Sequence, residues 1–165
     1  MSDAGREDFR RVLGHFPTGV TVITAHGEAG PVGMAANSFT SVSLDPPLVL
    51  ICPAKSSTTW PHIRDAGRFC ANILADHHAE VCRQFSRTDV DRFAGVSWHE
   101  RPGGPALDEA VAWVECEIDS EYDAGDHEIV VARVGPIQSA EAAQPLVFFR
   151  GGFGGFQSVT AGGES

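Results

Sequence analysis

The chain has 165 residues, of which 42% are hydrophobic and 21% are charged, and its formal net charge at pH 7 is −10. This length accommodates one domain with one hydrophobic core, and the composition excludes global disorder. The excess of acidic residues argues against a nucleic-acid partner, because binding to a phosphate backbone requires a basic face.

No membrane segment or secretion signal is evident. Apolar runs stay well short of the ~20 residues that a membrane helix needs, and the acid- and arginine-containing N-terminal segment lacks an apolar core. Four widely spaced cysteines without a C-x-x-C pair are expected to be reduced thiols. We therefore expect a cytoplasmic protein without a metal site. A single domain is expected over residues 1–165, with an ordered core over about 6–157 and a short glycine-rich C-terminal tail.

The first third predicts a helix followed by a hairpin. Apolar residues at i, i+3, i+4 and i+7 predict a helix over residues 6–16, which Pro17 ends. The β-branched run 19–25 predicts a strand, and the turn 26–30 leads from it into a second strand that begins at Pro31.

The stretch 33–55 is central to the sequence. It begins with a hydroxyl-rich run over residues 37–43, turns at Asp45-Pro46-Pro47 and continues as the apolar run 48–52. Small and hydroxylated residues let the backbone approach a ligand and offer it short donors. A plain polar strand face is an equally good interpretation of the hydroxyl run, and both remain open.

The middle of the chain predicts two helices around a strand. Serines and threonines before Trp60-Pro61 predict a helix start, and Gly67 ends that helix. A buried strand is predicted over residues 68–74 and a helix from Asp76 to near Ser86. The irregular segment 87–106 is long enough for a functional surface loop.

The last third is rich in strands. Alternation over 112–118 predicts a half-buried strand, a turn follows at 124–126, and strands are predicted over 128–134 and 145–149. In all, about six or seven strands and roughly three short helices are expected. Because the strands do not alternate with long helices, an antiparallel barrel is favoured over a doubly wound parallel sheet.

Two segments could bind a phosphate. Lys55 lies beside several hydroxyls and a helix start, which together offer charge, backbone N–H groups and side-chain donors. Ser86-Arg87 could supply a second cation. As solvated surface these residues would need no ligand, and only their combination favours a site. The glycine spacing of a P-loop or of a dinucleotide-binding fingerprint is missing.

His127 directly follows the Gly125-Asp126 turn at the mouth of a predicted hairpin. A histidine fixed there could donate to a carboxamide or a phosphate, although a plain turn histidine would look the same. Spacing reveals no Ser/His/Asp, Cys/His or paired-carboxylate arrangement, so covalent and hydrolytic catalysis have no support.

Taken together, these motifs resemble the short-chain flavin reductase family, the reductase components of two-component flavin-dependent monooxygenases. The similar blocks include FRRVLGHFPTGVTVITA (9–25), GMAANSFTSVSLDPPLVLIC (33–52), DRFAGVSW (91–98), GDHEIVVARV (125–134) and PLVFFRGGFG (145–154). They follow the family's order and cover nearly the whole chain, and the NSFTSVSLDPPLV and GDH blocks are the most specific.

The resemblance implies a mainly β fold, a six-stranded antiparallel split β-barrel of the FMN-binding type with Greek-key topology and peripheral short helices. It also implies a homodimer, FMN or FAD in a groove near the dimer interface, and NADH or NADPH as hydride donor. The reduced flavin would then pass to a monooxygenase partner.

The resemblance also assigns roles to residues. His127 would be the catalytic residue on the nicotinamide side. The remaining cofactor-binding residues would be Thr18, Asn37, Ser38, Phe39 and Thr40 near the flavin ring and ribityl chain; Ala54, Lys55, Ser56, Ser57, Trp60, Ser86 and Arg87 towards the phosphate; and Phe149, Arg150 and Phe153 along the nicotinamide side.

The chain departs from the family pattern in two places. Phe148, Phe149 and Phe153 stand where many relatives carry tyrosines, so ring faces are kept but hydroxyls are lost, which affects nicotinamide binding. Ala35 stands where many relatives have threonine. Two alternatives follow from the same fold: a non-catalytic flavin- or haem-binding sensor or carrier, and, more weakly, a pyridoxamine-phosphate-oxidase-like enzyme.

Overall fold

The fold is that of a computed structural model, which describes residues 3–140 and 143–159. Its helical elements are α1 (Asp3–Leu13), α2 (Trp60–Ala66), the 3-10 turn η1 (Asp76–His78) and α3 (Ala79–Ser86). The strands of the main sheet are β2 (Thr21–Gly27), β3 (Gly30–Ala36), β4 (Thr40–Leu44), β5 (Pro47–Ile51), β6 (Arg68–Ile73), β9 (Ala112–Ala124) and β10 (His127–Ser139). The short strands are β1 (Thr18–Gly19), β7 (Trp98–His99), β8 (Ala106–Leu107), β11 (Val147–Phe149) and β12 (Gly152–Gly154). No helix among the described residues is long and apolar enough to cross a membrane.

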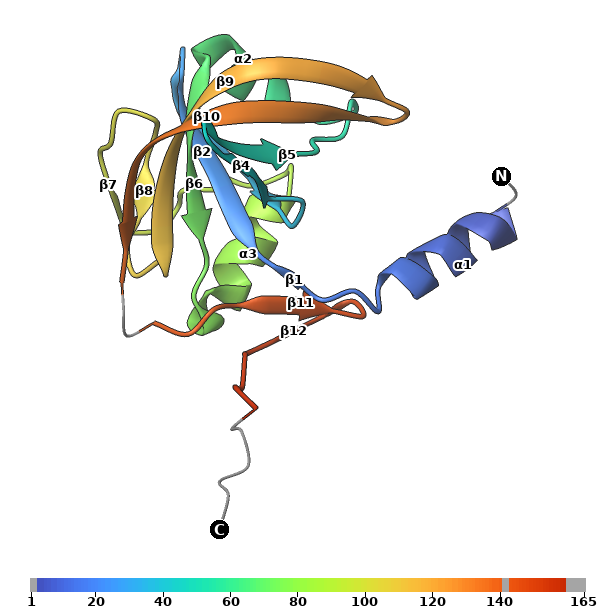
Figure 1. The fold of residues 1–165 in the computed structure, drawn as a ribbon. Coiled ribbons are helices and arrows are strands. Elements are labelled where there is room, and N and C mark those ends of the chain that lie inside the picture. Colours follow the sequence, from blue (N-terminus) through green and yellow to red (C-terminus); the bar gives the residue numbers. More distant parts are fainter. Residues whose placement is uncertain (1–2, 141–142, 160–165) are drawn as a thin grey trace.

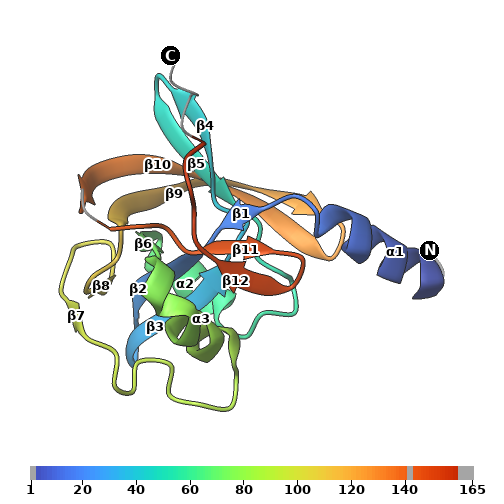
Figure 2. The ribbon, with the colours of Figure 1, turned by 90° about the horizontal axis from the view of Figure 1, so that it is seen from below.

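The main sheet is antiparallel and follows the order β3-β2-β6-β9-β10-β5-β4. It curls around one core, and the long β9–β10 hairpin arches over the barrel (Figure 1). The predicted class, a mainly β split barrel with peripheral short helices, is confirmed, but the sheet has seven strands where six were expected. The hydroxyl run accounts for much of β4, which pairs with β5 and forms a hairpin that projects from the barrel (Figure 2).

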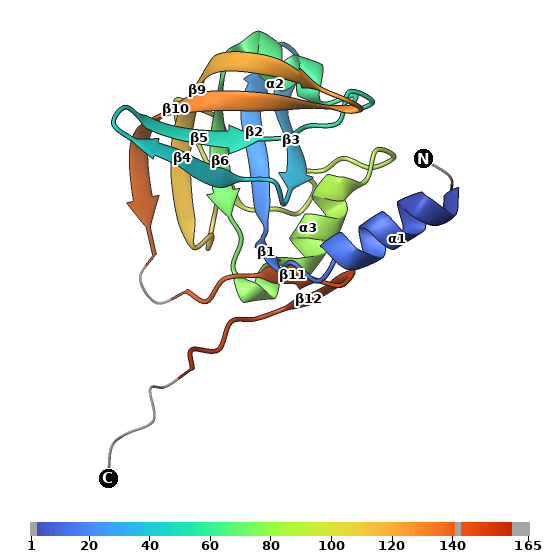
Figure 3. The ribbon, with the colours of Figure 1, turned by 45° about the vertical axis from the view of Figure 1, so that its right-hand side comes forward.

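The core fills the inside of the curled sheet. Ile23, Ile51, Phe69 and Val130 from four different strands are fully buried there, and Ile63 of α2 packs against them. Burying side chains of this size contributes roughly 1.5–3 kcal/mol each. On the other side of β2 and β3, α3 covers the sheet (Figure 3).

Helix α1 extends away from the barrel (Figures 1 and 2). It ends at Leu13, three residues before the predicted end, and the Gly14 N–H continues the bonding to the Arg10 carbonyl. None of its described residues is buried. The chain then passes into β1, which pairs with β11 in a small sheet of order β1-β11-β12. The stretch that follows the last predicted strand therefore contributes β12.

Candidate functional site

A pocket of about 430 Å³ lies where β3, the 52–58 loop, the end of α3 and the start of β10 meet. Its volume falls within the range of small-molecule sites. The sequence-predicted site residues that line it are Asn37, Ser38, Ala54, Ser56, Ser57, Ser86 and His127. The other lining residues are Met34, Ala35, Ala36, Cys52, Pro53, Thr58, Phe85, Thr88 and Arg92. Residues far apart in the sequence thus form one concave surface with apolar and hydroxylated parts.

Backbone hydrogen bonds hold the rim of this pocket together. The Lys55 N–H donates to the Asp126 carbonyl and the Glu128 N–H donates to the Pro53 carbonyl, each at 3.0 Å. Ala54 and His127 form an isolated β-bridge. Gly125 makes the tight turn possible, because its φ of 71° is strained for other residues. The β9–β10 turn is therefore fixed onto the 53–55 loop, and His127 is fixed with it.

The His127 imidazole is half exposed, with its Nδ1 2.7 Å from Asp126 Oδ1. A carboxylate only accepts hydrogen bonds, so Nδ1 carries the proton and Nε2 is left for a ligand. The hydrogen bond from His127 lowers the pKa of the Asp126 carboxyl. Asp126 therefore sets the orientation of the ring over the pocket.

Several hydroxyls of the pocket already have protein partners. Ser57 Oγ accepts from the Trp60 and Thr59 N–H groups at 3.1 and 3.3 Å. These backbone N–H groups at the start of α2 therefore already have a protein acceptor. Ser38 Oγ accepts from the Cys52 N–H, and Ser86 Oγ donates to the Cys82 carbonyl. These three serines shape the pocket and have less to offer a ligand than the sequence suggests.

Other predicted site residues lie away from the pocket. Trp60 is 2% exposed in the core, where its Nε1 donates to Glu128 Oε2 at 2.8 Å. Phe39 packs against the barrel core and Thr40 is exposed on β4. Lys55 pairs with Asp123.

Arg87 also has its own counter-ion. It makes a two-pronged contact with the exposed carboxylate of Asp89, through hydrogen bonds of 3.0 and 2.9 Å. This pairing raises the pKa of Arg87 and lowers that of Asp89. Arg87 lines a neighbouring hollow of about 870 Å³ along α3 instead of the pocket.

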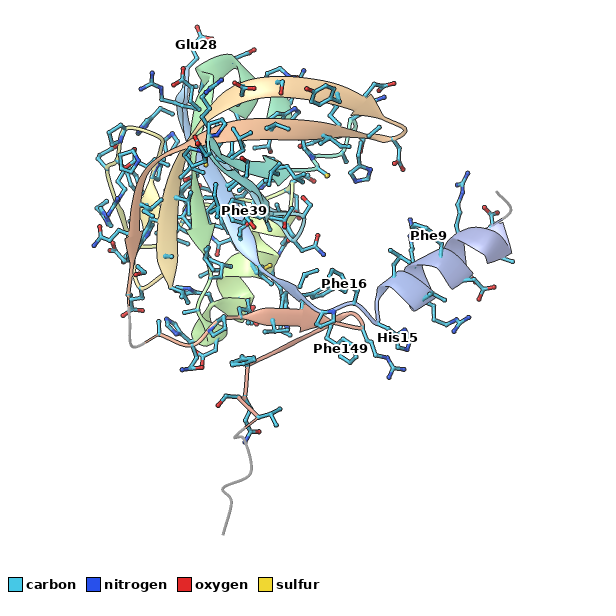
Figure 4. The ribbon with its side chains drawn as sticks, viewed as in Figure 1. Phe9, His15, Phe16, Glu28, Phe39 and Phe149 are labelled. Carbon is cyan, nitrogen blue, oxygen red and sulfur yellow. The ribbon has the colours of Figure 1, made fainter. Side chains whose placement is uncertain are left out.

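Two further hollows adjoin the pocket through shared residues. A hollow of about 830 Å³ lies between α1 and the β11–β12 turn and is lined by Thr18, Asn37, Phe148 and Arg150. A smaller one, of about 180 Å³, is lined by Asn37, Ser86, Phe148 and Phe153, among others. Phe149 is exposed on the turn and meets His15 edge-on, with ring centroids 6.4 Å apart (Figure 4).

Thr18 carries a polar atom without a partner. Its Oγ1 is buried, yet it makes no hydrogen bond to any described residue, and it is the only such side-chain atom in the described part of the chain. Buried hydroxyls normally have a partner, so Thr18 Oγ1 has hydrogen-bonding capacity that no described residue uses. Together, this hydroxyl, the free donors and the apolar lining of the pocket suit a flavin, which is a flat ring with a polar edge and a hydroxylated chain.

Arg92 and Thr88 are pocket residues that the sequence analysis missed. Both lie in the irregular segment 87–106, where no periodicity marks a site. The DRF block of the resemblance contains Arg92, and that block was the one available indication.

One cluster outside the pocket has metal-binding residue types. Ligand atoms of His77, His78 and Glu109 lie within 4.8 Å of one another. However, His78 Nδ1 accepts the Ala75 N–H at 3.2 Å, and burial lowers the pKa of His78, so the neutral ring carries its proton on Nε2. Without a free lone pair on His78, this cluster is a poor metal site.

The chain matches the family model described as "Flavin reductase like domain" over residues 13–157. A flavin reductase of Pseudomonas putida is 46% identical over 153 residues, covering 92% of this chain and 90% of the relative. A reductase subunit of a flavin-dependent monooxygenase, HsaB of Rhodococcus jostii, is 43% identical over 150 residues, covering 90% and 77%. The solved NADH:FAD oxidoreductase SgcE6 of Streptomyces globisporus superposes with a TM-score of 0.87 at 39% identity, covering 96% and 97%.

The fold and the site thus define a small-molecule-binding split barrel with a histidine fixed at the rim of its pocket. The chain belongs to the flavin reductase-like family. The predicted family and the predicted enzyme class, a flavin oxidoreductase, are confirmed, as is the flavin as cofactor. The comparisons support this function over the non-catalytic sensor or carrier.

Proposed function

We propose that this chain is an NAD(P)H-dependent flavin reductase that supplies reduced FMN or FAD to a partner flavin-dependent monooxygenase. The observation that carries the proposal is the pocket that His127, with its ring held by Asp126, lines together with apolar and hydroxylated residues. The names of the relatives support the same assignment, because one is a reductase subunit of such a monooxygenase. We also propose that residues 1–165 form one domain and that the protein acts in the cytoplasm.

The redox chemistry belongs to the flavin when it is bound, so the protein has to position two ligands and keep water out. Asn37, with its exposed amide, and Ala54 would border the flavin, while Thr18 Oγ1 would gain its missing partner. With its ring proton on Nδ1, His127 would accept at Nε2 a hydrogen bond from the amide of the nicotinamide carboxamide, and would thereby orient it. That the flavin supplies the redox chemistry and the protein only positions the ligands agrees with the lack of any nucleophile–base pair in the sequence.

The test is an anaerobic titration of the purified protein with NADH and, separately, NADPH in the presence of FMN, FAD or riboflavin. Bleaching of the flavin absorbance at a rate far above the enzyme-free rate is expected, with NADH and FAD as the first pair, since one similar structure carries them in its name. If none of the six combinations is turned over, the proposed function is wrong. For a combination that is turned over, subsequent addition of the partner oxygenase would report transfer of the reduced flavin.

We further propose that the protein is a homodimer. Phe9, Val12 and Leu13 of α1 are each more than half exposed, and Phe16 just after it is 74% exposed (Figure 4). Leu44 at the β4–β5 hairpin is 95% exposed. Such apolar surface is costly in water and suits a second copy of the chain.

Sedimentation velocity measures the oligomeric state directly. Wild type is expected to sediment as a dimer, and Leu13→Glu is expected to shift the equilibrium towards monomer. Glu7→Gln, a change on the same helix outside the apolar face, is the matched control. A wild-type protein that stays monomeric at micromolar concentration would contradict the proposal.

A further inference from the structure

Glu128 directly follows His127 on β10, so the two side chains point to opposite faces of the strand. His127 lines the pocket, whereas the Glu128 carboxylate contacts α2. Its Oε2 accepts a hydrogen bond from Trp60 Nε1 at 2.8 Å and a second one from Arg64 Nη2. One carboxylate oxygen therefore joins the strand of the histidine to α2.

The two donors on α2 are themselves held in place. Trp60 and Arg64 are four residues apart, so their side chains share one face of the helix. The Arg64 guanidinium lies over the Trp60 ring, with its Cζ 5.7 Å from the ring centroid. Trp60 and Ile63 of the same helix are buried in the core. Glu128 is thus bonded to a part of the molecule that core packing fixes.

The other contacts that hold His127 lie closer to solvent. Backbone hydrogen bonds fix the turn onto the 53–55 loop, and the carboxylate of Asp126, which holds the imidazole, is 97% exposed. A hydrogen bond at so exposed a position competes with water and adds little net stability. The Glu128 side chain is 22% exposed and gives the same segment a better shielded attachment.

Arg64 also contacts the neighbouring strand β9. Its Nε lies 2.9 Å from Glu121 Oε2, and Glu121 is the residue opposite Val130 in the β9–β10 register. The guanidinium thus bridges two carboxylates, one from each strand of the hairpin. Glu128 is adjacent to His127 and also accepts from Trp60, whereas Glu121 belongs to the other strand. The two carboxylates therefore provide a matched comparison within one cluster.

We propose that Glu128 is a positioning residue for hydride transfer. By binding Trp60 and Arg64, its carboxylate holds the β10 backbone so that the His127 imidazole keeps its place at the pocket. Glu128 contacts no reacting group and acts through His127. This inference rests on the proposed function, in which His127 orients the nicotinamide. Such positioning matters because the reacting atoms must approach to about 3–3.5 Å.

Stopped-flow reduction with NADH and FAD under anaerobic conditions tests the proposal. Glu128→Ala and Glu121→Ala each remove one carboxylate from Arg64, and the second is the matched control. At saturating NADH, Glu128→Ala is expected to slow flavin reduction by about 3- to 10-fold and to keep flavin affinity within about two-fold of wild type. Glu121→Ala removes a partly exposed ion pair and should keep the rate within about two-fold. Glu128→Gln, which keeps an acceptor for both donors, should recover most of the rate.

A double-mutant cycle with His127→Ala shows whether Glu128 acts through the histidine. If it does, Glu128→Ala has no further effect on the rate once the imidazole is absent. Independent effects would instead multiply. Trp60→Phe is a second variant that removes the indole N–H and keeps an aromatic ring in the core, so the test does not depend on the folding of Glu128→Ala. It should slow flavin reduction in the same direction, and its effect should also vanish in the His127→Ala background.

A measurement without turnover separates this inference from the proposed function. The Cε1–H resonance of the His127 imidazole is assigned by its absence from the spectrum of His127→Ala. In the ligand-free protein, Glu128→Ala is expected to shift or broaden this resonance, and Glu121→Ala should leave it unchanged. If wild type reduces no flavin but the resonance responds in this way, the proposed function is wrong and Glu128 still positions the histidine.

Three results would overturn the proposal. Equal rates of flavin reduction for Glu128→Ala and Glu121→Ala would mean that Glu128 only stabilises the contact with α2. A rate loss that persists in full in the His127→Ala background would show that Glu128 does not act through His127. An unchanged His127 resonance in Glu128→Ala would show that the imidazole keeps its place without this carboxylate.

Discussion

Two polar regions of the barrel differ in how their hydrogen bonds are used. In the first, between β2, β6 and the 103–107 segment, Asn72 is fully buried and all its polar atoms have partners. Its Nδ2 donates to the Val22 carbonyl at 3.0 Å and Thr24 Oγ1 at 3.1 Å, and its Oδ1 accepts from the Leu107 N–H at 2.7 Å. Thr24 Oγ1 in turn donates to the Pro105 carbonyl at 2.6 Å.

The second region is the pocket, where donors are left over. Arg92 Nη2 and the amide of Asn37 have no protein partner among the described residues, and Thr18 Oγ1 in the adjoining hollow has none either. A satisfied buried network stabilises one conformation, while fixed but free donors are available to a ligand. The position of unpaired donors, more than the position of polar residues, therefore distinguishes the ligand pocket from the structural hydrogen-bond network.

This contrast can be tested by replacing one asparagine with alanine in each region. Asn72→Ala leaves the Leu107 N–H buried without an acceptor, and a loss of about 2–4 kcal/mol in the free energy of unfolding is expected. FMN affinity of the folded fraction should stay unchanged. Urea denaturation and fluorescence titration measure the two effects separately.

Asn37→Ala is the counterpart, because Asn37 is exposed at the pocket. Its stability should change by less than about 0.5 kcal/mol, while its flavin affinity should fall. Were Asn72→Ala to weaken flavin binding in the folded fraction more than Asn37→Ala does, the distinction between the two regions would fail.

The next largest effect is expected at the pocket rim. His127→Ala should slow hydride transfer from NADH to bound flavin by about 10- to 100-fold, which corresponds to roughly 1.4–2.8 kcal/mol in the barrier, because the nicotinamide loses its positioning contact. Flavin affinity should change far less. Stopped-flow reduction under anaerobic conditions measures the step itself. Equal rates for variant and wild type would remove His127 from the proposed role.

Much of the fold could be predicted from local sequence. The alternation from Ala112 onward and the Gly125-Asp126 turn produced the β9–β10 hairpin, and Gly67 ends α2 as expected. The hydroxyl run left two interpretations open, and the structure supports a part of each. Thr40–Leu44 form the polar strand β4, whereas Asn37 and Ser38 stay at the pocket.

The site was harder to predict, because it depends on long-range contacts. Arg92 is held by Gly33 and Thr59, and no local pattern reveals such pairs. Trp60 was expected at the phosphate end, but burial of so large a ring, with Glu128 as partner for its N–H, places it in the core. The charges of Lys55 and Arg87 predict phosphate binding, but each side chain is already paired, with Asp123 and Asp89 respectively.

The smallest predicted effect concerns the unpaired hydroxyl of Thr18. Thr18→Val removes a buried polar atom that has no partner, so the ligand-free protein should gain up to about 1 kcal/mol in stability. Flavin affinity should fall by about 3- to 10-fold, since the hydroxyl no longer bonds to the ligand. Thr21→Val is the matched control, because Thr21 Oγ1 donates to the Ala36 carbonyl at 2.7 Å and its loss should destabilise the ligand-free protein. Thermal unfolding with and without FMN distinguishes the expected gain in stability of Thr18→Val from the expected loss of Thr21→Val. A Thr18→Val protein that is less stable without ligand and binds FMN normally would show that the hydroxyl stabilises the fold and does not bind the cofactor.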